Sequence, residues 1–513
     1  MENNLTNKEA KTNELLLIDT VAESSREVSE EFTLPDYVPE VRRVLGVSAQ
    51  AVPESKYVNT VNDGTVLECS GTVTYSVIYL NDEGALCALP LSSAYEITIP
   101  LNSTPYITEV SAHAESPCVR VSAPRRLNIK STIKNRAIAF KREECSAKIT
   151  PNSSAEQIYL EKREKEISTL DLNQISREGL KISERLDNLS EGEKPIWCDA
   201  SILLNEVKCQ SNMVSVRGEV NIKCLLIRDS GENVISRTFP ISEEIEANGT
   251  EAGEIARAYA RCVSLSISNE QRGESNELFF DLTYDINGEI VKNRRVDVEI
   301  DGYSTGHESE ASYKDLEYQS VASMGATSFT VSEGVKRKNK EIKEIITVLA
   351  DPVYEKCEIK GKRICLAGSL HAVVIGKETN EQSSTTEYYS DEYVLPIKLE
   401  VDGAQEINKI TPLCTLALGN LNARYDNEKF YINCEVLASY LLLNSHKQRV
   451  LDTLEIKTES KIKRNNAEVR VCFLNDKDEL WDIAKRYHTT EEKLREQNDL
   501  IDDTLFNKKC LII

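Results

Sequence analysis

The chain repeats itself about every 150 residues, and this repeat limits the folds that it can adopt. A glycine-led strand occurs three times, near Gly71, Gly218 and Gly368, which are 147 and 150 residues apart. Apolar residues follow each glycine at every second position, as in a strand with one buried face. Repeats of this length are whole domains rather than the short units of a solenoid. The sequence therefore predicts three copies of one β domain in tandem.

The other strands of each copy are predicted from the same alternation and from turn residues. A polar turn follows each glycine strand, and a returning strand follows it at 95–99, 238–245 and 393–399. A cysteine recurs 47, 44 and 46 residues after the glycines, at Cys118, Cys262 and Cys414. A last strand ends each copy, at 136–140, 278–286 and 430–443. Several short strands with turn signals predict a β-sandwich or a partly open barrel for each copy.

The segments around the copies are predicted to be short helical pieces or linkers. A helix-like piece precedes each copy, within 35–45, 194–198 and 341–346. The charged run 161–166 predicts a solvated helix or linker, and 304–312 and 337–343 predict the second linker. The polar break 461–466 predicts a linker before the last domain. The predicted domains are a disordered tail at 1–13, repeats at 14–143, 160–303 and 329–456, and a small domain at 467–513.

The end of the chain, from Val471 to Ile513, predicts a strand, two short helices and a final strand. One face of the first helix is apolar, formed by Leu480, Ile483, Ala484 and Tyr487 at i, i+3, i+4 and i+7. Asp478 is the predicted N-cap of this helix. Thr489 and Glu492 predict a capping box for the second helix. A unit this small has little room for an active site, so the pattern favours a binding role.

This segment resembles a LysM domain, the small glycan-binding module of cell-wall proteins. The resemblance rests on Asp478–Tyr487 and on Gln497–Leu500, and it implies a small α+β (βααβ) fold. The chain departs from the family pattern at Lys477 and Glu479, where a glycine and a small hydroxyl residue are usual. It also departs at 506–507, where the family usually has Pro-Gly. We therefore predict no peptidoglycan or other glycan binding of ordinary LysM strength, because burying unpaired charge against sugar is costly.

The three repeats resemble the SPOCS domain, which is named for a clostridial spore coat protein. The segment Leu34–Glu40 and the three glycine strands carry this resemblance. Three such repeats followed by LysM resemble the clostridial spore morphogenetic proteins. That resemblance implies a non-enzymatic scaffold in the mother-cell cytoplasm, at the forespore surface or spore coat. It also implies that LysM binds the ATPase of the coat basement layer, with other coat proteins as further candidate partners.

The partner-binding residues are predicted at the entry to the first helix and at the turn after the second. These two places form the ligand edge in the LysM family. The predicted residues are Lys477, Asp478, Glu479, Leu480, Trp481, Asn498 and Asp499. Trp481 lies one step off the apolar face of the first helix. It is interpreted either as a half-buried residue that closes the small core or as an exposed anchor for a partner, and both can hold at once.

Charge and composition exclude several classes of partner and location. The chain has 62 Lys and Arg against 84 Asp and Glu, a net charge of −22, which disfavours nucleic acid and anionic membranes. No run approaches 18 apolar residues, so we expect no direct membrane insertion. The sequence begins without a signal-peptide pattern, and its 14 cysteines include no C-x-x-C pair. We therefore expect reduced thiols and a cytosolic location.

The sequence shows no motif for catalysis. It lacks H-E-x-x-H, G-x-S-x-G and Walker A patterns, so we expect no enzyme activity, no cofactor and no metal. The three repeated cysteines could bind a metal only if the domains bring them together, and a structural strand position is favoured. The repeat glycines are interpreted as β-bulge or close-packing positions. The alternative function is a peptidoglycan-binding cell-wall protein that uses LysM on N-acetylglucosamine glycans.

Overall fold

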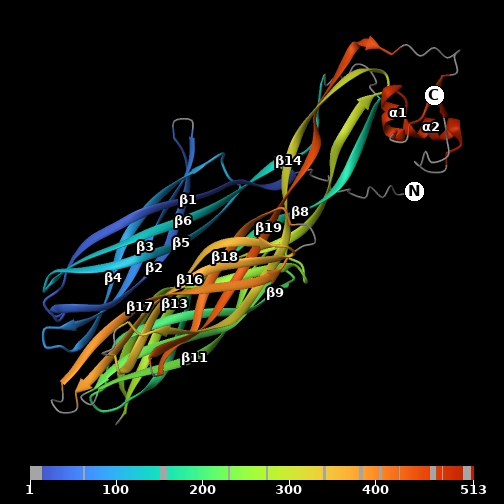
Figure 1. Ribbon diagram of the computed structural model, residues 1–513. Helices are drawn as coiled ribbons and strands as arrows, with labels where there is room; N and C mark the ends of the chain where they lie inside the picture. Colours follow the sequence, from blue (N-terminus) through green and yellow to red (C-terminus); the bar gives the residue numbers. More distant parts are fainter. Residues whose placement is uncertain are drawn as a thin grey trace, which may run out of the picture.

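The computed structural model consists almost entirely of antiparallel β-strands (Figure 1). It describes residues 14–61, 64–150, 159–228, 231–272, 275–338, 342–380, 385–403, 407–426, 428–462, 470–475, 478–500 and 510–513. The predicted fold class is confirmed, since the sheets form separate β domains and both helices lie in a small C-terminal unit. The predicted tail at 1–13 lies outside the described residues. In the described part of the chain, no helix is long and apolar enough to cross a membrane.

Six long strands form each of three successive units. The first unit contains β1 (Glu14–Thr33), β2 (Val41–Val61), β3 (Gly64–Asn81), β4 (Leu86–Leu101), β5 (Ile107–Ala123) and β6 (Arg126–Glu144). The second contains β8 (Leu160–Leu189), β9 (Lys194–Gln210), β10 (Met213–Arg228), β11 (Gly231–Glu246), β12 (Ile255–Arg272) and β13 (Ser275–Ser304). The third contains β14 (His307–Lys336), β15 (Glu344–Lys360), β16 (Arg363–Asn380), β17 (Thr385–Asp402), β18 (Lys409–Asp426) and β19 (Lys429–Lys461).

The three units share one topology of two three-stranded sheets. The second, third and fourth strands form a meander, as in β2-β3-β4, β9-β10-β11 and β15-β16-β17. The other sheet places the last strand between the first and the fifth, as in β1-β6-β5, β8-β13-β12 and β14-β19-β18. The short strand β7 (Lys148–Thr150) adds a parallel pairing to β19. Residue 329, the predicted start of the third repeat, lies inside β14.

The predicted period-two face of each glycine strand forms the core of its unit. In β3, Val73, Tyr75 and Val77 are all fully buried. The corresponding residues of β10 and β16 are also buried, namely Val220, Ile222, Cys224, Leu370, Ala372 and Val374. Each set packs against residues of its unit's second sheet. The alternation therefore predicted correctly which face of each strand lies inside.

The repeat glycines occupy positions where two strands come too close for a side chain. A Cβ on Gly71, Gly218 or Gly368 would lie 2.2, 2.1 or 2.2 Å from a carbonyl oxygen of the neighbouring strand. In all three sheets the strand register shifts near this contact. The interpretation as β-bulge or close-packing positions agrees with this geometry.

The predicted helical pieces are wrong, because strand pairing extends into them. β9 begins at Lys194, and β2 and β15 begin within the other two segments, although residue 341 itself lies outside the description. The charged run 161–166 belongs to β8 and pairs with β13, so its charges lie along a solvated strand rather than a helix. The predicted linker 304–312 is the end of β13, a tight turn at Thr305–Gly306 and the start of β14.

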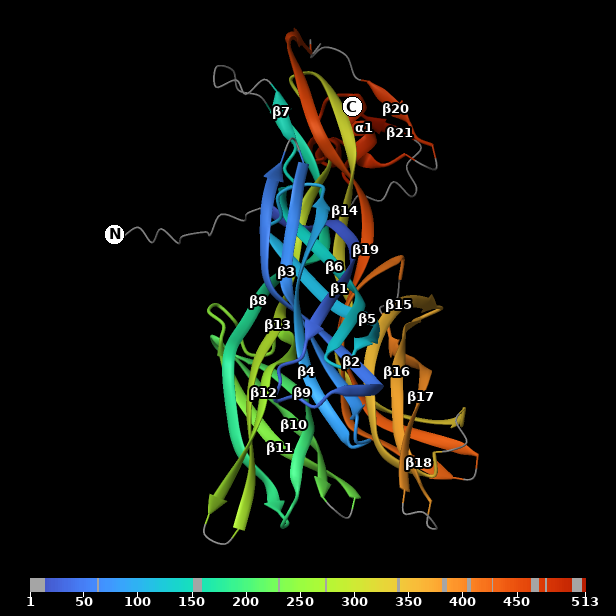
Figure 2. The ribbon, with the colours of Figure 1, turned by 90° about the vertical axis from the view of Figure 1, so that its left-hand side faces the viewer.

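The outer faces of the three glycine strands contribute to one of the contacts among the units. The residues seven positions after the repeat glycines are Ile78, Leu225 and Ile375, and each is 0% exposed. All three belong to one apolar cluster with Trp197 and Leu349. Because corresponding residues belong to this cluster, the repeats share an apolar core. Figure 2 shows the three units side by side, in blue, green and orange.

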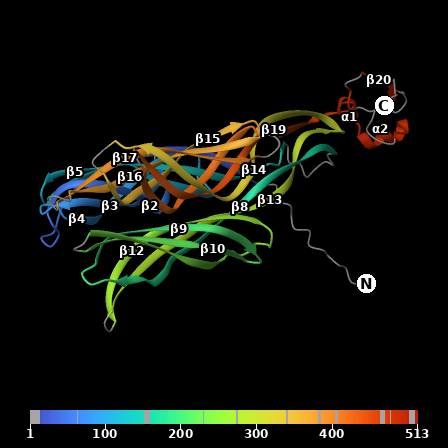
Figure 3. The ribbon, with the colours of Figure 1, turned by 60° about the horizontal axis from the view of Figure 1, so that its bottom comes forward.

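Four strands extend beyond the sandwiches and form a stalk. We define the stalk as residues 160–170 of β8, 294–304 of β13, 307–318 of β14 and 448–461 of β19. The C-terminal unit lies at its tip (Figures 1 and 3). This unit contains β20 (Val471–Phe473), α1 (Leu480–Arg486), α2 (Glu491–Asn498) and β21 (Cys510–Ile512).

Candidate partner-binding site on the C-terminal unit

The C-terminal unit has a small apolar core between two helices and a two-stranded sheet. β20 and β21 pair in antiparallel fashion, with Val471 opposite Ile512 and Phe473 opposite Cys510. The buried residues of the unit are Cys472, Leu480, Trp481, Ile483, Ala484, Leu494 and Leu511. The predicted apolar stripe of the first helix therefore faces this core.

The helix starts differ from the predicted caps by one residue each. Glu479, rather than Asp478, is the N-cap of α1, and its side chain makes no capping bond. The Asp478 carboxylate instead accepts a bond of 2.8 Å from the backbone N–H of Asn475 and closes the preceding turn. Thr490, rather than Thr489, caps α2 by accepting a 3.1 Å bond from the Lys493 N–H. Helix ends commonly differ by one or two residues from a position judged by sequence pattern.

Asn498 and Asp499 have structural roles at the end of α2. The Asn498 amide donates to the carbonyl of Ile512 at 2.8 Å and accepts from its N–H at 2.7 Å, so it joins α2 to β21. Asp499 follows with φ of 50° and forms the left-handed C-cap of the helix.

In a comparison with known protein families, residues 477–509 match the LysM domain. The C-terminal unit is a LysM domain. No curated protein and no solved structure matches the chain. A LysM domain indicates binding of carbohydrate, peptidoglycan or protein. This match places the candidate functional site on the LysM domain and the surface that surrounds it.

One carboxylate of the stalk accepts several bonds from the LysM domain. Asp301 of β13 accepts hydrogen bonds from the Trp481 indole N–H at 2.8 Å and from the Lys485 ammonium at 2.6 Å. The Tyr313 hydroxyl of β14 donates to the same carboxylate at 2.6 Å. Partial burial would raise the pKa of Asp301, but the bonds from Lys485, Tyr313 and Trp481 outweigh it and lower that pKa. We call Asp301, Tyr303, Tyr313, Trp481 and Lys485 the Asp301 cluster.

Tyr303 adds an apolar contact to this cluster. Its ring is 1% exposed and packs edge-on against Trp481, with 5.1 Å between ring centroids and 72° between planes. Its hydroxyl donates to the carbonyl of Thr489 at 2.7 Å. Trp481 is only 5% exposed, so in this structure it closes the small core and does not form an exposed anchor.

The seven predicted partner-binding residues fall into three groups. Lys477 lies outside the described residues. Leu480, Trp481 and Asn498 are buried, so their side chains offer little surface to a partner in this arrangement. The other three lie toward the surface, namely Asp478, Glu479 and Asp499. Their role in partner binding remains a prediction.

The LysM sheet carries an exposed apolar face that the sequence analysis missed. Phe473 is 78% exposed, Val471 is 48% exposed and Ile512 is 45% exposed. Cys510, opposite Phe473, is also exposed. We call these four residues the β20–β21 face. Alternation alone could not reveal it, because Val471, Cys472 and Phe473 are all apolar and their pattern does not say which side is buried.

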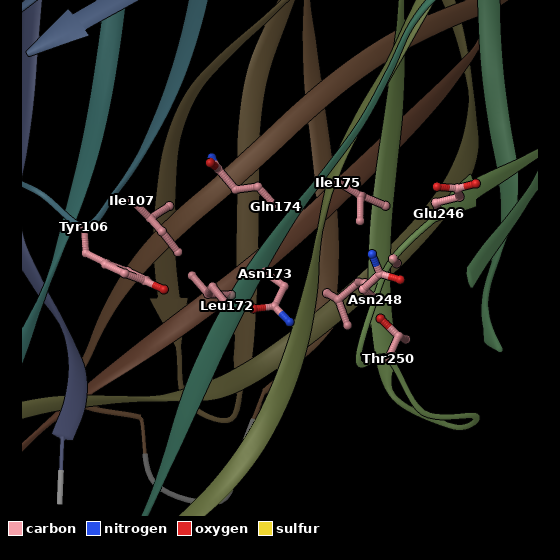
Figure 4. A pocket seen from close by; sticks show the side chains of 11 residues that line it. Tyr106, Ile107, Leu172, Asn173, Gln174, Ile175, Glu246, Asn248 and Thr250 are labelled. Atoms are coloured by element: carbon pink, nitrogen blue, oxygen red, sulfur yellow. The ribbon is translucent and has the colours of Figure 1, made fainter. Parts of the chain in front are cut away.

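A groove of about 520 Å³ lies where the first two units meet (Figure 4). Tyr106 and Ile107 of the first unit line one side, while Asn173 of β8 and Asn248 and Thr250 of the second unit line the other. The Arg142 guanidinium stacks on the Tyr106 ring at 4.4 Å. Because its wall comes from both units, we interpret the groove as part of their interface.

The repeated cysteines do not form a metal site in the described part of the chain. No group of three or more His, Cys, Asp or Glu suited to a metal occurs there. Burial raises the pKa of Cys262 and of Cys414 to about 12, whereas Cys118 is exposed. These two half-buried thiols stay protonated at neutral pH, which suits structural strand positions rather than reactive ones.

Proposed function

We propose that the chain is a non-enzymatic scaffold whose LysM domain binds a protein, the ATPase of the spore coat basement layer. The proposal places it in the mother-cell cytoplasm at the forespore surface, where it helps to encase the forespore in coat. Other coat proteins are further candidate partners through the repeats. The observation that carries the protein-binding part is the β20–β21 face.

An exposed aromatic side chain flanked by aliphatic ones is typical of the centre of a protein interface. Phe473 has most of its surface in water, and Val471 and Ile512 extend the same face. Burying such residues against a partner releases about 25 cal/mol for each Å² of apolar surface. Aromatic anchors of this kind contribute much of the binding energy in many interfaces. The face therefore supports a protein as the ligand.

The rest of the chain supports a scaffold role. Three packed sandwiches and a stalk give an extended surface with a net charge of −22 over the whole sequence. Such a charge favours solubility and basic protein partners. The spore context is inferred from the resemblance of the three repeats plus LysM to spore morphogenetic proteins.

The test is capture of the chain by the purified basement-layer ATPase. We expect Phe473→Asp to lower the affinity about thirtyfold or more, because it places a charge at the centre of the interface. Tyr57→Asp is the matched control, since Tyr57 lies in β2 of the first unit and is 67% exposed. Loss of capture in both variants, or in neither, would contradict the assignment of the partner to this face.

The second candidate function is binding of N-acetylglucosamine glycans, which the LysM match itself favours. In the structure, Glu479 is exposed and its carboxylate pairs with Arg163 of β8 at 2.8 Å. A charged pair at this edge favours a ligand other than a neutral sugar. Sedimentation of the full chain with purified peptidoglycan tests this candidate, and micromolar binding would favour the cell-wall function.

Turnover of muropeptides by the full chain would contradict the non-enzymatic role.

A further inference from the structure

We propose that the Asp301 cluster fixes the LysM domain on the stalk, so that Trp481 and Lys485 position the domain and the β20–β21 face points to the partner. The proposal rests on the proposed function for the partner's identity alone, because the contact that it concerns lies within the chain.

The polar part of the contact is stronger than an ordinary surface pair. The Asp301 carboxylate accepts three bonds of 2.6 to 2.8 Å, two of them from the LysM domain and one from β14. One donor is a charged ammonium, and charge-assisted bonds are about twice as strong as neutral ones. The side chains of Asp301 and Lys485 are 19% and 33% exposed, so salt screens this pair less than a fully solvated one.

The apolar part of the contact completes the LysM core with a residue of the stalk. Tyr303 belongs to the same buried cluster as Leu480, Ile483 and Trp481, although it comes from β13. If the LysM domain were separated from the stalk, the Tyr303 ring of the stalk and one side of the Trp481 indole of the domain would face water. An edge-to-face pair contributes about 0.5–1.5 kcal/mol beyond the area that it buries. Separation of the LysM domain from the stalk is therefore unfavourable, because it exposes apolar surface on the domain and on the stalk.

Contacts on either side of Asp301 prevent the domain from rotating on a single attachment. The His488 imidazole Nδ1 lies 3.2 Å from the Ser304 carbonyl oxygen at the end of β13. Glu479 pairs with Arg163 on β8, as described above. Three separate contacts on two strands of the stalk define an orientation as well as a position.

The resulting orientation turns the β20–β21 face away from the stalk. The residues of α1 make the contact with the stalk, whereas Phe473, Val471 and Ile512 remain exposed. Figure 2 shows α1 beside the stalk and the two strands on the outer side of the domain. A partner thus meets a face already held in place, which reduces the ordering cost of binding. Trp481 holds the LysM domain in its place on the stalk and makes no contact with the partner.

The test uses the indole N–H signals of the full chain, labelled at tryptophan with nitrogen-15. The chain has two tryptophans, and the Trp197 N–H donates to Ser76 in the shared core at 2.6 Å, so it is an internal reference. We expect Asp301→Ala to speed hydrogen exchange at Trp481 at least about tenfold and to leave Trp197 unchanged. Glu308→Gln, an exposed carboxylate at the start of β14, is the matched control and should change neither signal. Unchanged exchange at Trp481 in Asp301→Ala would overturn the proposal.

Capture by the basement-layer ATPase separates this proposal from the proposed function. We expect Asp301→Ala to weaken capture about three- to tenfold, since a released domain must be ordered on binding. Phe473→Asp should lower the affinity of capture about thirtyfold or more while leaving exchange at Trp481 unchanged. Faster exchange with capture unaffected would overturn the positioning role. Full capture by Phe473→Asp would overturn the assigned face alone, and the exchange result would still decide whether the domain is fixed.

Discussion

Arg257 and Glu289 form an ion pair that is almost completely removed from solvent, with 4% and 1% of their side chains exposed. The guanidinium Nη2 donates to Glu289 Oε1 at 3.1 Å. Its Nη1 donates to the carbonyls of Leu413 and Ser439 at 3.1 and 3.3 Å, and both of these belong to the third unit. A charge pair of the second unit is thus part of the contact between two units.

Glu289→Gln should be strongly destabilising, because it leaves the Arg257 charge buried without its carboxylate. We expect the free energy of unfolding to fall by about 3–5 kcal/mol, measured by denaturant titration. The matched control is Glu400→Gln, which breaks the exposed pair between Glu400 and Arg363. Exposed pairs contribute about 0–1 kcal/mol. Equal effects of the two substitutions would show that the buried pair has no special role.

Glu109 makes the stability of this region depend on pH. Desolvation, together with the nearby Glu289 charge, raises the pKa of Glu109 to about 8, while Lys56 and Gln174 oppose the rise. Arg257 and Tyr259 also face it. The folded chain therefore keeps a proton on Glu109 that the unfolded chain loses near its ordinary pKa, so stability from this group falls as pH rises from about 4.5 to 8.

Glu109→Gln should remove this loss, since the amide resembles the protonated carboxyl. We expect the variant and the wild type to differ least near pH 5, and the variant to be more stable by about 2 kcal/mol at pH 8 and above. Unfolding titrations across this range measure the difference. A constant difference between pH 5 and pH 8 would contradict a raised pKa for Glu109.

The repeat glycines give a prediction about packing. Gly218→Ala would place a Cβ 2.1 Å from the Leu203 carbonyl oxygen, so the two strands must separate. We expect a loss of about 1–3 kcal/mol in the free energy of unfolding, as for an overpacked core. Gly306→Ala serves as the control, because no atom lies within 4 Å of its added Cβ. If Gly218→Ala left the free energy of unfolding unchanged, the two strands at this bulge would be able to separate without loss of stability.

The sequence predicted the interior of each repeat well, because a buried strand face has apolar residues at every second position. Val73, Val220 and Leu370 could be placed in the core from their spacing after the glycines. The strand starts near Lys194 and Glu344 were missed, because pairing with a distant strand overrides weak local helical signals. The charged start of β8 was missed for the same reason, since its partner β13 lies more than 100 residues away.

The candidate site was predicted less completely than the fold. The LysM pattern identified the domain, yet the environment of Trp481 depends on Asp301 and Tyr303, which are 180 and 178 positions earlier in the chain. No local pattern encodes a contact of that separation. The exposure of Phe473 could not be predicted from the sequence either, because it depends on which side of a short strand the helices cover.

The shared core of the three units gives a last prediction. Leu225 is 0% exposed and lies in the same apolar cluster as Ile78 and Ile375, the corresponding residues of the other two units. Leu225→Ala removes apolar contacts between units rather than within one sandwich, and we expect a loss of about 2–5 kcal/mol. Val263→Ala, at a residue of β12 that is 49% exposed, is the matched control and should cost little. Limited proteolysis should cut Leu225→Ala faster between the units while each sandwich persists. Should cleavage instead fall within the second sandwich, Leu225 would support the fold of its own unit rather than the contact among the three.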